Sequence, residues 1–183
     1  MLAQAGDFAI AGSYGSAAVY TLGGHDPRRG APFVHYETVG GGLGAGPAGP
    51  GTDGMRVHMG NTMNLPIEAM EAAMPILFEE YALVEGSGGR GRHRGGCGVR
   101  KRFRALADGL EFSALLERSL VPARGYRGGG EGARAAVRVI RRKGRVEDLP
   151  SKTRLVLDRD DGIEIVTAGG GGWGTPGTGN GSN

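Results

Sequence analysis

One stretch of this sequence gathers polar side chains of several chemical kinds directly before a predicted helix. Residues 52–64 (TDGMRVHMGNTMN) combine a carboxylate, an imidazole, hydroxyls and two amides with two glycines. Neutral imidazole can serve as acid, base or metal ligand near pH 7, and an asparagine amide can bond an amide or a carboxylate. Because backbone N–H groups at a helix start favour anions, we interpret the stretch as a candidate substrate pocket. The side chains concerned are Asp53, His58, Asn61, Thr62 and Asn64.

Each of these residues has a predicted role and a simpler alternative. His58 and Asp53 are the predicted catalytic residues, with His58 as acid, base or ligand and Asp53 orienting it. Asn61, Thr62 and Asn64 are predicted to bind the substrate. The alternative is a loop whose polar groups satisfy one another, with a packed His58, an Asp53 that stabilises a turn, and an Asn64 that caps the helix. Both interpretations stay open.

A single helix is readable, and it begins just after this stretch. Asn64 can cap it, Pro66 suits its first turn, and acidic residues follow near its positive N-terminal end. Pro75 pushes the residue before it out of the α conformation. The helix is therefore expected to end by about Ala73.

The rest of the chain has the pattern of β-strands. Asp26-Pro27 favours a tight turn, and residues 33–39 beyond it are strand-like. In residues 76–84 the apolar side chains of Ile76, Phe78, Ala82 and Val84 share one parity, and residues 99–105 alternate apolar positions with three arginines. Further strands are expected at 110–116, 135–140, 154–157 and 163–167.

These elements predict an α+β, β-rich fold, with several short antiparallel strands, one clear helix and long glycine-rich loops. The 38 glycines are about three times the average usage, but they fall in blocks between segments that carry aliphatic and aromatic residues. A low-complexity chain is therefore excluded, and a folded domain with unusual loops is expected.

Composition excludes several other classes. A formal net charge of +3 identifies no partner. The single cysteine, Cys97, excludes an internal disulfide framework and a zinc site built from several thiolates. The single cysteine makes a reducing cytoplasm the expected location, and no apolar run approaches the roughly 18 residues of a membrane span. No G-x-x-x-x-G-K-[ST] loop occurs, so the glycine runs are not a nucleotide cradle of that type.

Five sequence blocks, in order, resemble the hydantoinase B/5-oxoprolinase family. The block YETVGGGLGA is similar to the family's YETIGGGMGA, HMGNTMNLPIE to HMTNTxNTPIE, GSGGRGRHRGG to GSGGxGxxRGG, LPSK to LPSK, and GGGGWG to the terminal glycine-tryptophan block. They occupy residues 36–45, 58–68, 86–96, 149–152 and 169–174. The resemblance covers nearly the whole chain and is to the C-terminal portion of the family, with a glycine-rich tail at 169–183.

The resemblance implies an ATP-dependent enzyme that opens 5-oxoproline or hydantoin rings with a hydantoinase A type partner, in a hetero-oligomer. Related members carboxylate ketones. ATP and Mg²⁺ would be bound by the partner, any divalent metal would belong to an upstream region, and no metal ligand is assigned in this chain. Gly41 and Gly42, in the first block, are expected to line the substrate pocket. The block that resembles the family's LLSDR appears here as Ala114-Leu115-Leu116-Glu117-Arg118. The sequence is interpreted as a fragment or a split subunit, which is expected to be inactive alone.

Two further hypotheses stay open beside the enzyme. The Gly- and Arg-rich residues 88–96 resemble RNA-binding segments, although the run is short and contains no aromatic residue, so no nucleic-acid partner is expected. The chain could otherwise be a purely structural domain that shapes a pocket without supplying catalytic groups.

Overall fold

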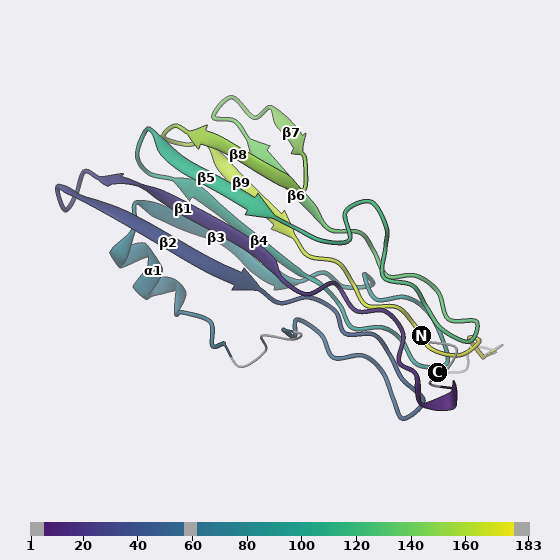
Figure 1. Cartoon of the computed structure of the whole chain (residues 1–183). Helices are drawn as coiled ribbons and strands as arrows, with labels where there is room; N and C mark the ends of the chain where they lie inside the picture. The colour runs from purple at the N-terminus through teal and green to yellow at the C-terminus, as the bar shows by residue number, and fades with distance from the viewer. Residues whose placement is uncertain (1–5, 57–61, 178–183) are drawn as a thin grey trace, which may run out of the picture.

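Two antiparallel β-sheets face each other in the computed structural model, which describes residues 6–56 and 62–177. Figure 1 shows the sheets stacked at one end of the molecule and long extended segments running from them to the other end. Four strands form one sheet, in the order β2 (Ala31–Val39), β1 (Ala18–Asp26), β5 (Leu110–Leu115) and β8 (Lys152–Leu157). Five form the other, in the order β3 (Ile76–Leu83), β4 (Val99–Ala105), β9 (Gly162–Val166), β6 (Ala136–Ile140) and β7 (Val146–Leu149).

The core lies between the two sheets, where alternate residues of each strand point inward. Tyr20 on β1 and Phe112 on β5 meet Phe103 on β4, with ring centroids 5.8 and 6.1 Å from Phe103. All three are buried, as are Ile163 and Ile165 on β9. Aromatic contacts therefore join the sheets across the centre of the sandwich.

The predicted fold class and most strands are confirmed. The turn after Asp26 joins β1 to β2, and the alternation of residues 99–105 places Val99, Phe103 and Ala105 inside and three arginines outside. The parity predicted for residues 76–84 is wrong at Ala82, which is exposed. The register of β3 shifts between Phe78 and Glu80, so the face that looks inward changes at this bulge.

The predicted helix is α1 (Ile67–Ala73), which ends where Pro75 requires. Its N-cap residue is Pro66, and no side chain caps it. The prediction that Asn64 caps the helix is therefore wrong. Asn64 lies two residues before that position, and its carboxamide oxygen accepts a hydrogen bond from Arg56 instead. No helix among residues 6–56 and 62–177 is long and apolar enough to cross a membrane.

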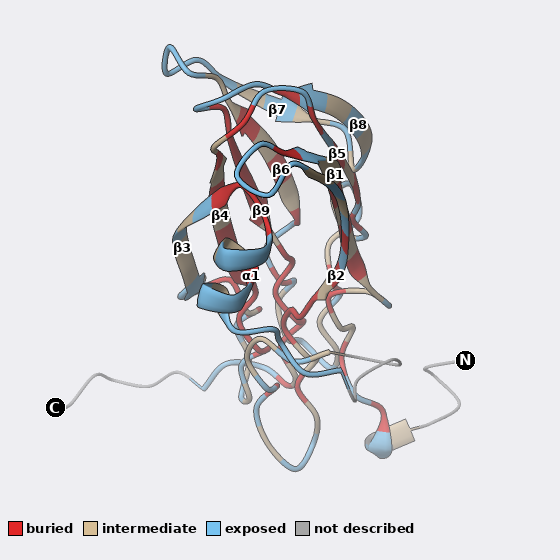
Figure 2. Cartoon of the chain, turned by 90° about the vertical axis from the view of Figure 1, so that its left-hand side faces the viewer, coloured by how far each residue is buried: buried red, intermediate tan, exposed pale blue. Residues whose placement is uncertain are grey.

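The glycine blocks form a bundle of extended segments at one end of the sandwich. Hydrogen bonds between main chains hold it together, including Gly42 N–H to Ala168 O (3.0 Å), Gly96 N–H to Leu43 O (2.8 Å) and Gly170 N–H to Gly96 O (2.9 Å). Thr167 links this bundle to the sheets, because its buried hydroxyl donates to Gly40 O and accepts from Val99 N–H. In Figure 2 the buried residues continue from the sheets into the bundle.

These segments lie too close together for any side chain at their contact points. A Cβ atom on Gly42 would lie 1.9 Å from Gly96 O, and one on Gly170 would lie 1.9 Å from Leu43 O. Real Cβ atoms do not approach a backbone oxygen so closely, so the segments would have to separate. The unusual glycine content is thus a packing requirement of this bundle.

Gly42→Ala should destabilise the protein by about 3 kcal/mol or more, because neighbouring backbone must move to admit a methyl group. Gly49→Ala is the matched control, since a Cβ there meets nothing within 4 Å. Chemical denaturation of both variants measures the difference. Equal unfolding midpoints for the two would contradict the packing role of Gly42.

Candidate functional site

Of the predicted pocket residues, Thr62 and Asn64 lie beside β2, because Arg56 binds both of them and Thr38 of that strand. His58 and Asn61 lie outside the described residues, so their predicted roles stay predictions. Asp53, Thr62 and Asn64 lie within them, on either side of residues 57–61.

Asp53 is engaged in hydrogen bonds to other loops. Its carboxylate accepts from both terminal nitrogens of Arg94, at 2.8 and 2.9 Å, and from the backbone N–H of Cys97 at 2.7 Å. The hydrogen bond from Arg94 is the main reason that the pKa of Asp53 falls to about 2, with a smaller contribution from Cys97 N–H against the opposing effect of burial. In this arrangement Asp53 anchors the glycine-rich loop of Arg94 and Cys97.

Thr62 and Asn64 gather around Arg56. The guanidinium donates to the carbonyl oxygens of Thr38 and Thr62 and to Oδ1 of Asn64. Thr38 belongs to β2, so Arg56 ties the chain on both sides of residues 57–61 to the edge of a sheet. The side chain of Asn64 is exposed, as a residue that contacts substrate would be.

Gly41 and Gly42 are buried in the bundle. A Cβ on Gly41 would lie 2.4 Å from the ring of Tyr14, and both glycines exchange backbone hydrogen bonds with neighbouring segments. Their predicted contact with substrate stays a prediction, while their packing role is evident.

Directly beneath this edge lies a buried polar cluster, formed by Tyr20 on β1, His35 and Glu37 on β2, and Lys101 on β4. Lys101 Nζ lies 2.7 and 2.6 Å from the two carboxylate oxygens of Glu37. The Tyr20 hydroxyl donates to Glu37 at 2.5 Å, and His35 Nε2 lies 3.3 Å from the same oxygen. Lys101 is fully buried, and Glu37 is 7% exposed.

The electrostatics of the cluster favour an ionised Glu37. Burial alone would raise its pKa, but hydrogen bonds from His35, Lys101 and Tyr20 and the Lys101 charge outweigh burial and hold the pKa at about 2. Burial lowers the pKa of Lys101, and the Glu37 carboxylate opposes this. Burial, followed by the charge of Glu37, raises the pKa of Tyr20, which therefore stays a protonated donor.

Aromatic rings complete the surroundings of the ammonium group. Lys101 Nζ lies 4.8 Å from the ring centroid of Tyr81, 5.0 Å from that of Phe78 and 5.5 Å from that of Tyr20. Such ring faces attract a cation and replace part of its hydration. Hydrogen bonds, the ion pair and these ring contacts thus make the cluster a network that positions β2 and β3 beneath the predicted pocket.

Sequence reasoning missed this cluster, although a signal was present. In residues 99–105 Lys101 has the parity of Val99 and Phe103, and in residues 33–39 Glu37 has the parity of Phe33 and Val39. A single positive charge on the apolar face of one strand and a single negative charge on that of another could have predicted a buried ion pair.

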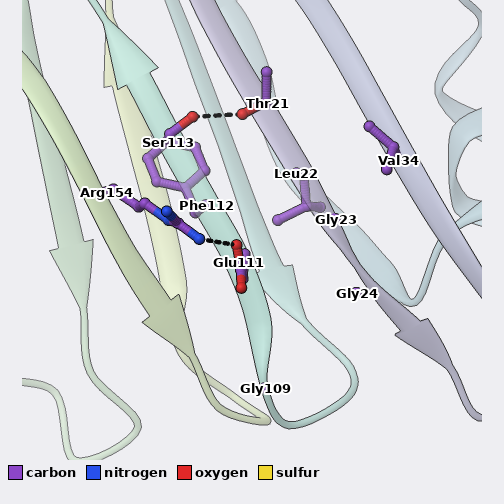
Figure 3. Close-up of a pocket in the computed structure, with 10 residues that line it drawn as sticks. All are labelled: Thr21, Leu22, Gly23, Gly24, Val34, Gly109, Glu111, Phe112, Ser113 and Arg154. Atoms are coloured by element: carbon purple, nitrogen blue, oxygen red, sulfur yellow. Dashed lines mark hydrogen bonds and ion pairs between the residues drawn. The ribbon is translucent and has the colours of Figure 1, made fainter.

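The other polar features do not form a second site with these residues. No group of three or more His, Cys, Asp or Glu side chains suited to a metal occurs within the described part of the chain. The groove of Figure 3 lies on the outer face of the four-stranded sheet, where Arg154 bonds Glu111 and Thr21 bonds Ser113. None of the predicted site residues lines it. Cys97 is buried beside Arg94.

The sequence is similar to a known protein family and to named members of it. The family model for hydantoinase B/oxoprolinase matches residues 1–176. The chain is 38% identical over 143 residues to 5-oxoprolinase 1 of Arabidopsis thaliana, covering 78% of this chain and 11% of that protein.

Two solved structures share the fold. One is the crystal structure of the ATP-dependent caprolactamase from Pseudomonas jessenii, at a TM-score of 0.75 and 26% identity, covering 95% of this chain and 32% of that one. The other is nucleotide-free acetone carboxylase, at a TM-score of 0.76 and 16% identity, covering 92% and 27%. The chain spans only about a ninth of the length of the 5-oxoprolinases that it matches.

Lys101→Met should cost about 3–5 kcal/mol of folding free energy, because it leaves the Glu37 carboxylate buried without its cation. Adding Glu37→Gln should recover part of this loss, since a neutral side chain tolerates burial better. Denaturant unfolding of the single and double variants gives both quantities. Lys152→Met, at an exposed position of β8, is the control, and a loss equal to that of Lys101→Met would refute the proposed pairing.

The stability of the protein should fall as the pH drops from about 4.5 to about 2. The folded state lowers the pKa of Glu37 from its ordinary 4.5 to about 2, so the carboxylate stabilises the fold above that window and loses this effect as it protonates. Unfolding free energies measured across the window should change less steeply with pH in Glu37→Gln. An unchanged slope in that variant would count against an ionised Glu37.

Proposed function

This chain belongs to the hydantoinase B/oxoprolinase family, and we propose that it is part of an ATP-dependent enzyme that opens a small cyclic amide such as 5-oxoproline, a hydantoin or a larger lactam. The observation that carries the proposal is the family match over residues 1–176. It is supported by relatives that are named 5-oxoprolinase and caprolactamase subunit beta. Since the chain spans only a fraction of their length, the active unit includes further chain or subunits.

The reaction adds water across the ring C–N bond of the amide, which leaves a carboxylate and an amine from a lactam, or a carboxylate and a ureido group from a hydantoin. We assign ATP and Mg²⁺ to a hydantoinase A type partner, since the sequence has no P-loop of the G-x-x-x-x-G-K-[ST] kind. The described residues do not fit a divalent metal site, because they contain no cluster of three suitable ligands. We therefore derive no step through a metal on this chain.

This chain would contribute the polar stretch at the edge of the sandwich. Arg56 ties the residues on both sides of positions 57–61 to β2, and Asp53 is fixed by Arg94. Anchors of this kind hold the residues that they bind in defined positions. Asn64 and Thr62 would orient the ring amide, and His58 would accept or donate a proton.

A second candidate is a structural domain that shapes the pocket but supplies no reacting group. Asp53, Gly41 and Gly42 favour it, because all three are engaged in contacts between loops.

A cytoplasmic location remains an expectation from the single cysteine.

Lactam-dependent ATP hydrolysis should appear only when the chain is combined with a hydantoinase A type subunit and the upstream region of its relatives. The assay measures phosphate release and ring opening of 5-oxoproline, hydantoin and caprolactam, by the chain alone and by the mixture. A stable complex that opens none of these rings would contradict the proposed activity.

Within the active assembly, His58→Ala should lower turnover by about 100-fold or more if the imidazole transfers a proton, with little change in the unfolding midpoint. Asp53→Asn should instead lower the unfolding midpoint, because it weakens the bond to Arg94. Steady-state kinetics and thermal unfolding of both variants separate the two roles. A His58 variant that loses stability and keeps turnover would favour the structural domain.

A further inference from the structure

A cavity of about 410 Å³ lies between α1 and β2, on the outer side of the buried cluster. Figure 1 shows α1 beside the sheets and away from the glycine bundle. The size and the mainly apolar lining are those of small-molecule sites in proteins. The apolar lining residues include Phe33, Leu65, Ala69, Met70, Ala73 and Met74.

The helix that forms one wall of the cavity is fixed in place. Arg28 in the turn between β1 and β2 donates to Glu71 O at 3.0 Å, and Arg29 donates to Ala73 O at 3.5 Å. The Glu71 carboxylate in turn accepts from Phe78 N–H on β3 at 2.7 Å. Contacts from both sheets therefore hold α1 in place as one wall of the cavity.

His35 is the polar group on the wall formed by β2, and its side chain is 91% buried because only 9% of it is exposed. Its Nε2 lies 3.3 Å from Glu37 Oε2 and 3.4 Å from the Tyr20 hydroxyl. An ionised carboxylate can only accept hydrogen bonds, so Nε2 carries a proton, and Nδ1 is the ring nitrogen that accepts when the ring is neutral. Among the described residues, the hydrogen bonds of His35 involve Nε2, and Nδ1 has no partner. Nδ1 is not one of the fully buried atoms that lack a partner, so it is accessible.

We propose that this cavity binds a small, mainly apolar ring compound whose single N–H or O–H group donates to Nδ1 of His35. The apolar walls supply most of the affinity, and the histidine selects ligands that carry a donor. The proposal is independent of lactam hydrolysis, because it concerns a different set of side chains from the predicted pocket.

Phenol is a suitable probe, and benzene, which lacks the O–H hydrogen-bond donor, is the matched control. Titration of the full 183-residue chain by calorimetry, with ¹⁵N amide shifts to locate the site, should show saturable phenol binding that perturbs α1 and β2. Benzene should bind about fivefold more weakly, the worth of one hydrogen bond.

Ala69→Phe fills the cavity from an exposed helix position and leaves the buried cluster intact. It should weaken phenol binding at least about tenfold. Ala72→Phe, exposed on the same helix and not part of the lining, should bind phenol as the wild type does.

Absence of saturable phenol binding would overturn the site, and so would equal binding by Ala69→Phe and the wild type. Equal affinity for benzene and phenol would overturn the role of His35. Far-ultraviolet circular dichroism and unfolding midpoints of the two variants establish that both are folded, so that a loss of binding in Ala69→Phe alone supports the site.

Discussion

The buried pair of Glu37 and Lys101 is the interaction on which the arrangement of the two sheets depends. Removing both charges from water costs several kcal/mol for each ion, and only good geometry offsets that cost. Here the ammonium contacts both carboxylate oxygens and faces three aromatic rings, while Tyr20 and His35 bond the carboxylate. Glu37 is on an edge strand of one sheet and Lys101 on an inner strand of the other. A slip of either strand by one residue would turn its charged side chain outward and leave the other charge in the apolar core without its partner. The pair therefore selects one register for the sandwich.

The glycine bundle extends this order beyond the strands. The segments that emerge from the sheets lie next to one another and stay in contact through their main chains. Thr167 joins the sheets to the bundle. Loops usually lie on the surface and vary in conformation. In this protein main-chain hydrogen bonds join the loops and many of their glycines are buried, which gives the polar residues between them, such as Asp53, fixed positions. A scaffold of this kind is suited to hold a pocket at its edge.

Local chemistry allowed much of the fold to be predicted from the sequence. Alternation identified β4, the Asp-Pro turn identified the first hairpin, and Pro75 marked the end of α1. The β-bulge in β3 escaped prediction, because the extra residue leaves no mark in the hydrophobic pattern before its pairing with β4 is known. The pairing of Lys101 with Glu37 also escaped prediction, because it depends on which strands of the two sheets face each other, and a single sequence does not reveal that. Of the site, the polar stretch could be recognised, while the engagement of Asp53 with Arg94 arises between residues 41 positions apart.

The bundle also constrains the order in which the chain can fold as it is synthesised. Gly170 bonds Gly96, Gly171 donates to Gly12, and Gly42 donates to Ala168, so the segment at 168–171 joins parts of the chain made much earlier. Contacts so distant in sequence form slowly, since the intervening chain must be ordered to close them. A ribosome-bound chain can pair β1 with β2 soon after they emerge, but the bundle is complete only once residues 168–171 have been made. Any chaperone that attends this protein would therefore meet a half-built sandwich rather than a chain that folds as it is made.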